Sequence, residues 1–234
     1  MIFNHRQSRG ARLWLLLTAL LLVLPAARAH GVSESDAGFL ASAAGVHVLP
    51  FLYLGAKHMV TGYDHLLFLC GVIFFLYKMK DIGIYVTLFA LGHSTTLLLG
   101  VLNGWHINAY IVDAIIGLSI VYRAFDNLGG FRATFGVQPN KKAAVLIFGF
   151  FHGLGLATKL QDFRLSPDGL LANMVSFNVG VEIGQLLALG LILIAMRWWR
   201  GTASFVRHAV TANFALMACG FTLAGYQFTG YLIR

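Results

Sequence analysis

The chain has 234 residues, of which 58% are hydrophobic and only 11% charged, and its mean hydropathy is +0.75. Soluble domains carry about 25% charged residues, so a soluble enzyme, a coiled coil and a disordered linker are excluded. The formal net charge of +8 would suit a nucleic-acid binder only if the basic residues shared one soluble face. They fall instead in small groups between long apolar runs, so the sequence predicts an all-α integral membrane protein with no nucleic-acid partner.

The first 29 residues have the order of a secretory signal peptide. Three arginines precede the apolar run 13–24, and the small-x-small pattern Ala27-Arg28-Ala29 follows it. The apolar run is too short to cross about 30 Å of hydrocarbon. We therefore expect cleavage after Ala29, with the new N-terminus outside the cytoplasm.

Residues 30–57 are expected to form a periplasmic or interfacial segment. The stretch 37–56 has no charge and is long enough to span, and it contains His47 and Pro50. Counting it as a span would reverse every later loop and place most basic residues outside the cell. We therefore predict an interfacial or re-entrant helix on the outer face.

The remaining chain, residues 58–234, predicts a bundle of six membrane-spanning helices, each of about 20 residues or more. These spans cover residues 60–77, 82–102, 108–125, 143–160, 169–196 and 204–233. With the mature N-terminus outside, the basic residues are concentrated inside, as the positive-inside rule requires. We therefore predict a multi-pass protein of the bacterial inner membrane with both termini in the periplasm. The inner segments hold Lys78, Lys80, Arg123, Arg132, Lys141, Lys142, Arg197, Arg200 and Arg207, against Lys57, Lys159, Arg164 and Arg234 outside.

Ionisable side chains inside these spans cost roughly 2.5–3.5 kcal/mol each near the bilayer centre and so mark candidate functional sites. The first span carries His58, Asp64 and His65 near its outer start. Because His58 and His65 are two helical turns apart, we expect them to share a face, with Asp64 beside them. The later spans add His93, Asp113, His152 and Glu182 at similar depth.

This set of imidazoles and carboxylates predicts a divalent-metal site. Both cysteines, Cys70 and Cys219, lie inside apolar runs without the spacing of a thiolate site. Without thiolates, the set suits nickel, cobalt, zinc or copper(II) better than magnesium or copper(I). Ser94, Asn178 and Gln185 are candidate partners that would orient the imidazoles. A proton relay built from the same acids and histidines is an alternative use.

Glycines flank the candidate site residues along the chain. Small residues let two helix backbones approach closely inside a membrane. We therefore expect close helix contacts at Gly92, Gly153, Gly155, Gly180 and Gly184.

Four motifs in the predicted spans together resemble the HupE/UreJ family of bacterial membrane proteins, and most closely its second, broader branch. The similarity covers about residues 55 to 230, and the motifs are specific in combination. They are His58-x5-Asp64-His65, Leu91-Gly92-His93-Ser94-Thr95-Thr96, Phe151-His152-Gly153 and the run from Phe177-Asn178 through Glu182 to Gln185-Leu186.

The resemblance implies a nickel or cobalt permease of the kind encoded beside hydrogenase or urease systems. It implies first-span metal ligands at His58, Asp64 and His65, and it matches His152 to the second histidine motif of the family. Asp113 stands where relatives carry an acid. The chain departs from the permease pattern at Lys159, where relatives have an acidic residue.

The sequence therefore favours a divalent transition-metal permease, with nickel or cobalt as the first choice and zinc or copper as alternatives. The metal would arrive at His58 and His65 and move through His93, His152 and Glu182 to the cytoplasm. Two alternatives stay open. An intramembrane zinc hydrolase would use nearly the same ligands to keep its metal. A non-transporting assembly subunit would act beside metalloenzyme maturation partners or as a homo-oligomer.

Overall fold

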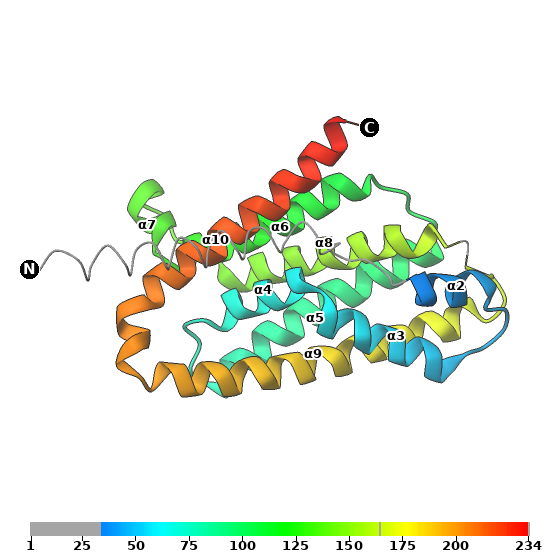
Figure 1. Ribbon diagram of the computed structural model, residues 1–234, viewed down its shortest axis with the longest axis horizontal. Helices are drawn as coiled ribbons and strands as arrows, with labels where there is room; N and C mark the ends of the chain where they lie inside the picture. The colour runs from blue at the N-terminus through cyan, green and yellow to red at the C-terminus, as the bar shows by residue number, and fades with distance from the viewer. Residues whose placement is uncertain (1–33, 164, 234) are drawn as a thin grey trace, which may run out of the picture.

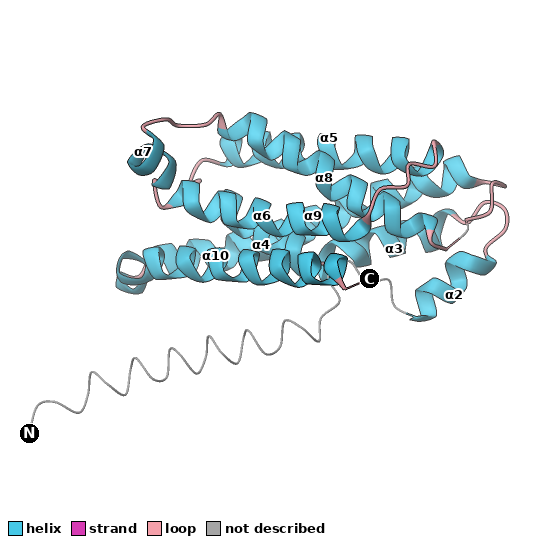
Figure 2. Cartoon of the chain, turned by 90° about the horizontal axis from the view of Figure 1, so that it is seen from above, coloured by secondary structure: helices cyan, strands magenta, loops and turns pink. Residues whose placement is uncertain are grey.

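The computed structural model describes residues 34–163 and 165–233, so the predicted signal peptide lies outside the described residues. The regular elements of this part of the chain are all helices, which confirms the predicted all-α class. The long helices run along one axis of the molecule (Figure 1, Figure 2). In chain order the helices are α2 (Glu34–Ser42), α3 (Val48–Thr61), α4 (Tyr63–Ile73), α5 (Met79–Leu102), α6 (Ala109–Asn127), α7 (Gly130–Phe135), α8 (Lys141–Gln161), α9 (Leu170–Arg200) and α10 (Ala203–Leu232).

Local sequence sets where several helices begin. The side chain of Asn108 accepts hydrogen bonds from the backbone N–H groups of residues 110 and 111, at 3.0 and 3.3 Å, and so caps α6. Asn140 caps α8 in the same way. Asparagine is among the preferred residues at this position because its oxygen satisfies N–H groups that the first turn leaves without a helical partner. The starts of α6 and α8 are therefore each fixed by a single side chain.

The first predicted span, residues 60–77, is not one helix in the structure. The chain forms α3 and α4 with a break at Gly62, so the predicted span begins inside α3. The predicted boundary between residues 57 and 58 also falls within α3. An added Cβ at Gly62 would lie 3.0 Å from the Nδ1 atom of His65 and 3.1 Å from the carbonyl oxygen of His58. A side chain at this position would therefore require its neighbours to shift by a few tenths of an ångström.

The stretch 37–56, predicted to lie on the outer face, is divided between α2, a short linker and the first part of α3. Helix α3 packs lengthwise against α9 (Figure 1). The linker is fixed to the start of α9 by Asn173, whose Oδ1 accepts from the N–H of His47 at 2.7 Å and whose Nδ2 donates to the carbonyl of Gly45 at 2.8 Å. This segment is therefore part of the helical packing.

Three pairs of helices pack most closely, namely α3 with α9, α5 with α8, and α6 with α10. Glycines line each contact. At the first seam, a Cβ at Gly184 would lie 2.5 Å from the carbonyl oxygen of Ala56, and at the second, a Cβ at Gly92 would lie 2.5 Å from that of Leu146. At the third, a Cβ at Gly117 would lie 2.6 Å from the backbone nitrogen of Ala224. Inside a membrane, lipid already covers apolar side chains, so burying them does not drive helices together. Close backbone packing at small residues drives helix association instead.

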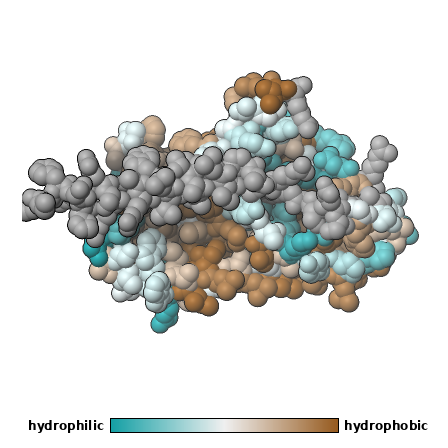
Figure 3. Space-filling view, viewed as in Figure 1, coloured by the Kyte–Doolittle hydropathy of each residue, from teal (hydrophilic) through white to brown (hydrophobic). Residues whose placement is uncertain are grey.

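Four of the predicted spans are helices long and apolar enough to cross a membrane, within the part of the chain that the structure describes. These are α5, α8, α9 and α10. Helix α4 has only 11 residues, and α6 carries Asp113, Arg123 and Asp126 within its 19 residues. Large apolar side chains such as Leu191 and Ile194 on α9 are exposed. Figure 3 shows this apolar surface along the side of the molecule where α9 lies.

The short helix α4 ends inside the protein, and side chains from other helices satisfy its last carbonyl groups. Arg200 of α9 donates to the carbonyl oxygens of Phe74 at 2.8 Å and Leu76 at 3.0 Å. Arg123 of α6 donates to that of Val72 at 3.3 Å. In a membrane, backbone outside a helix is tolerated where protein groups satisfy it. These arginines therefore satisfy carbonyl groups at the end of α4 and in the turn that follows it.

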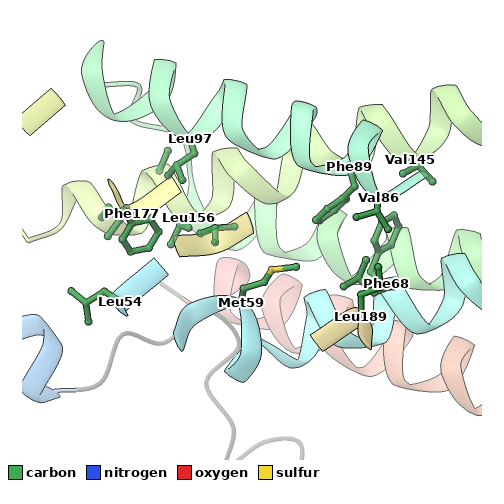
Figure 4. Packing of buried hydrophobic residues seen from close by; sticks show 14 of the residues in the cluster. Leu54, Met59, Phe68, Val86, Phe89, Leu97, Val145, Leu156, Phe177 and Leu189 are labelled. Carbon is green, nitrogen blue, oxygen red and sulfur yellow. The ribbon is translucent and has the colours of Figure 1, made fainter. Parts of the chain in front are cut away.

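The core is continuous around α4, α5 and α9. Phe68 and Phe89 meet at its centre with ring centroids 5.2 Å apart (Figure 4). Met59, Leu156 and Phe177 bring α3, α8 and α9 to the same core. This apolar packing surrounds the level at which the predicted histidines lie.

The α3–α9 seam can be tested with one methyl group. A Cβ added at Gly180 would overlap the carbonyl oxygen of Leu52, whereas one added at Gly190 on the same helix meets nothing within 4 Å. We expect Gly180→Ala to destabilise the protein by about 1–3 kcal/mol, the usual cost of overpacking. Gly190→Ala should leave the thermal unfolding temperature in detergent unchanged or slightly raised. Equal unfolding temperatures for both variants would contradict close backbone packing between α3 and α9.

Candidate metal centre

The break at Gly62 brings the first predicted ligands together. His58 lies in the last turn of α3, and Asp64 and His65 lie in the first turn of α4. The rings of His58 and His65 have centroids 5.2 Å apart. The prediction that they lie together is correct, but its reason was wrong. They meet because two helix ends face each other across the break, not because they share the face of one continuous helix.

Asp64 and His65 form an oriented pair. Asp64 Oδ1 accepts from the backbone N–H of His65 at 2.9 Å and lies 3.1 Å from its Nδ1. A carboxylate accepts, so the ring donates through Nδ1–H and keeps its lone pair on Nε2. Carboxylate–histidine pairs of this kind fix the ring orientation at metal sites.

His65 is the centre of the histidine cluster, which we define as His58, His65, His93 and His152. Its ring centroid lies 4.9 Å from that of His152 on α8 and 5.5 Å from that of His93 on α5. Ligand atoms of Asp64, His65 and His152 all lie within 4.8 Å of one another. Four helices therefore bring imidazoles to one place in the core.

The cluster is enclosed. His65, His93 and His152 are fully buried, and the rings of Phe68 and Phe89 pack against His152 with centroids 5.1 Å away. Within the described residues, neither ring nitrogen of His93 has a hydrogen-bond partner. A buried polar group without a partner costs about 1–3 kcal/mol. The placement of His93 therefore favours a ligand at this site.

Ser119 on α6 is a site residue that sequence reasoning missed. Its hydroxyl donates to the carbonyl of Ile116 at 2.6 Å, so its oxygen accepts from Nε2–H of His152 at 3.2 Å. This tautomer leaves the lone pair of His152 on Nδ1. A lone serine in an apolar helix carries no spacing signal, because its partner is 33 residues away.

Asp113 is engaged by a cation. Its Oδ2 lies 2.6 Å from Nζ of Lys159 on α8 and accepts from Nε2 of Gln227 on α10 at 3.2 Å. Its Oδ1 lies beside Gly155, where an added Cβ would be 3.4 Å away. Lys159 therefore compensates the acid that the sequence grouped with the metal ligands.

Glu182 is placed apart from the cluster. It is exposed on α9 and lines a groove with Thr87 and Leu91 of α5. Asn178 and Gln185 on the same helix are buried, whereas Glu182 is exposed. Gln185 is buried but donates to the carbonyl of Val86 at 3.2 Å, not to an imidazole.

The other two predicted orienting partners also do not hold an imidazole. Asn178 is buried on α9, and within the described chain its Oδ1 has no hydrogen-bond partner. The hydroxyl oxygen of Ser94 likewise has none among the described residues. Ser119 and Asp64 take the orienting roles that the sequence assigned to these residues.

The donor set fits a borderline divalent ion. Imidazole nitrogens dominate, Asp64 adds one carboxylate, and the two cysteines, half-buried Cys70 and buried Cys219, lie outside the cluster. Imidazoles suit nickel, cobalt, zinc and copper(II), whereas magnesium and calcium prefer oxygen ligands.

Comparison with known proteins agrees with the motifs. The family model described as "HupE / UreJ protein" matches residues 34–234, which is most of the chain. Searches of curated proteins and of solved structures give no match.

The hydrogen bond from His152 to Ser119 can be tested by metal binding. Ser119→Ala removes the acceptor that fixes the tautomer of His152, so we expect the affinity of purified protein for Co²⁺ to fall about 10- to 100-fold. The matched control is Ser176→Ala, because that hydroxyl donates to the carbonyl of Ala172 within its own helix at 2.8 Å. Isothermal titration in detergent measures both. An equal loss in the two variants would contradict the role of Ser119.

Proposed function

The chain belongs to the HupE/UreJ family, and from this premise we propose that it is a permease that carries a divalent transition metal, nickel or cobalt, into the cytoplasm. The metal ion is the cargo. The histidine cluster and Asp64 form its binding site inside the membrane.

One observation carries this proposal, namely that ligand atoms of Asp64, His65 and His152 lie within 4.8 Å of one another in the core. Burying these groups side by side stabilises nothing by itself, because polar side chains removed from water lose their hydration. Ionisable residues inside membranes typically mark ion pathways for this reason. A dication that accepts their lone pairs gives the arrangement a purpose.

The cluster also suggests the order in which the ion meets its ligands. His58 lies beside His65, and His65 lies beside both His93 and His152. An ion entering at the end of α3 would pass from His58 to the Asp64–His65 pair and then to His93 and His152. The ring centroids of neighbouring histidines lie 4.9–5.5 Å apart. An ion can therefore form a bond to the next imidazole while its bond to the previous one breaks.

The same arrangement favours transport over permanent retention. A structural zinc site holds four protein ligands in closed tetrahedral geometry, and a catalytic site holds three and keeps the fourth position for water or substrate. Here the ligand atoms of Asp64, His65 and His152 lie within 4.8 Å of one another, and His58 and His93 offer further imidazoles beside His65. Conduction needs binding strong enough to admit an ion and weak enough to release it.

The distribution of charge supports an orientation for this transport. Lys141 at the start of α8 and Arg200 at the end of α9 lie at the end of the bundle where α7 lies, and α2 lies at the opposite end (Figure 1). Under the positive-inside rule, the α7 end faces the cytoplasm. We propose that the protein lies in the bacterial inner membrane with the His58 side toward the periplasm.

Uptake of radiolabelled Ni²⁺ or Co²⁺ by cells expressing the protein tests the function. We expect His65→Ala to reduce uptake to the level of cells without the protein, because His65 contacts every other member of the cluster. His208→Ala is the matched control, since His208 is exposed on α10 and bonds within its own helix. Normal uptake by the His65→Ala variant, at equal expression, would refute a pathway through the cluster.

The zinc hydrolase and the assembly subunit predict different results from the permease in two measurements. A zinc hydrolase would keep stoichiometric metal through treatment with a chelator, whereas a permease would lose it. An assembly subunit would leave uptake unchanged when deleted but reduce recovery of a partner complex. Metal content after chelation and uptake after deletion therefore separate the three functions.

Reporter fusions test the proposed orientation. Alkaline phosphatase is active only in the periplasm, so a fusion after Arg234 should be active. An insertion at Gly136, in the loop that follows α7, should be inactive. Green fluorescent protein at the same two positions should give the reverse pattern. Activity at Gly136 would reverse the orientation and the direction of transport.

A further inference from the structure

Lys159 places a positive charge next to a proposed metal site. Its Nζ atom lies 2.6 Å from Asp113 Oδ2, and the side chains of Lys159 and Asp113 are 18% and 5% exposed. The same ammonium is within electrostatic range of His58. A cation in this place would repel an arriving dication unless its charge were compensated, and Asp113 supplies that compensation.

Asp113 is close enough to the cluster to matter to a bound ion. Its carboxylate is within electrostatic range of Asp64 and His65. Its Oδ1 lies beside Gly155, which is one turn after His152 on α8. Without the ammonium on Oδ2, this buried acid would add a second carboxylate at the side of the site.

The number of carboxylates decides which cations such a site prefers. Calcium and magnesium bind oxygen ligands and need several of them, whereas cobalt and nickel accept imidazole readily. A site with one carboxylate and several imidazoles discriminates against the hard cations. A second carboxylate weakens that discrimination because it raises the negative charge and adds oxygen ligands.

We propose that Lys159 is a specificity-determining residue, which binds Asp113 and thereby withholds a second carboxylate from the histidine cluster, so that Mg²⁺ and Ca²⁺ are excluded. This inference rests on the proposed function. It gives the ion pair a role that the cluster alone does not require. The lysine acts as a fixed internal cation that occupies the acid in place of a hard metal ion.

Gln227 completes the arrangement. It donates from α10 to the same oxygen that Lys159 contacts, at 3.2 Å. Two donors from α8 and α10 therefore hold Asp113 Oδ2 on the side of those helices. The neutral amide of Gln227 helps to orient the carboxylate of Asp113. The ammonium of Lys159 supplies the positive charge on which cation selection depends.

The test measures Co²⁺ binding to purified protein in detergent, with Mg²⁺ as competitor. In the wild type, a large excess of Mg²⁺ should leave the apparent affinity for Co²⁺ unchanged. In Lys159→Gln, the same excess should weaken it about tenfold or more, which corresponds to about 1.4 kcal/mol. Lys142→Gln is the matched control, because Lys142 is exposed in the first turn of the same helix.

A double variant keeps the inference open to refutation if Lys159→Gln does not fold. Lys159→Gln with Asp113→Asn removes both charges at once and leaves no uncompensated acid. We expect it to bind Co²⁺ and to exclude Mg²⁺ as the wild type does. Loss of Co²⁺ binding would show that Asp113 is itself a ligand and would overturn the proposal, as would Mg²⁺ sensitivity equal to that of Lys159→Gln.

The inference and the proposed function fail in different ways. A wild type that binds neither Co²⁺ nor Ni²⁺ refutes the metal site. A wild type that binds Co²⁺, together with a Lys159→Gln variant that still excludes Mg²⁺, refutes only the role of Lys159.

Discussion

At three seams of the bundle, glycines bring two helix backbones into direct contact, and the positions of His93 and His152 follow from one of these contacts. Gly92 and Gly153 are the neighbours of His93 and His152, and they pack α5 against α8. Thr96 strengthens this seam by donating to the carbonyl of Phe150 at 2.7 Å. A side chain in place of either glycine would push the helices apart and separate the two rings. The metal centre is therefore a consequence of backbone packing as much as of ligand identity.

The sequence predicted the helical class and marked the histidines that the structure buries together, because both depend on residue type. Apolar runs predicted the helices, and the cost of burying His65, His93 and His152 marked them in any membrane arrangement. The expected close approach is confirmed at Gly92, Gly153, Gly180 and Gly184, each of which contacts the backbone of a neighbouring helix, whereas Gly155 lies against side chains of α6. The break at Gly62 was not predicted. A glycine between His58 and Asp64 reads as an ordinary residue of an apolar span until the contacts around it are known.

The sequence could not show toward which side of its helix each side chain points. Glu182 has the same depth and residue type as the ligands, yet it lies on the exposed side of α9, because the face toward α3 is taken by Gly180 and Gly184. Asp113 and Lys159 are far apart in the chain, so their pairing was invisible, and Lys159 read only as a departure from the permease pattern. For the same reason Ser119 was missed, although it holds His152.

Charge compensation then distinguishes one acid from the others. Helices α6 and α8 are joined by polar contacts at three levels. They are Asp113 with Lys159 at 2.6 Å, Ser119 with His152 at 3.2 Å, and Asp126 with Lys141 at 3.5 Å. Asp126 also accepts from Arg123 at 2.6 Å. The acids above and below the cluster are thus neutralised by basic residues, whereas Asp64 contacts an imidazole. The other candidate ligands beside Asp64 at this level are imidazoles. An imidazole-rich site of low negative charge therefore results from pairing each neighbouring acid with a base.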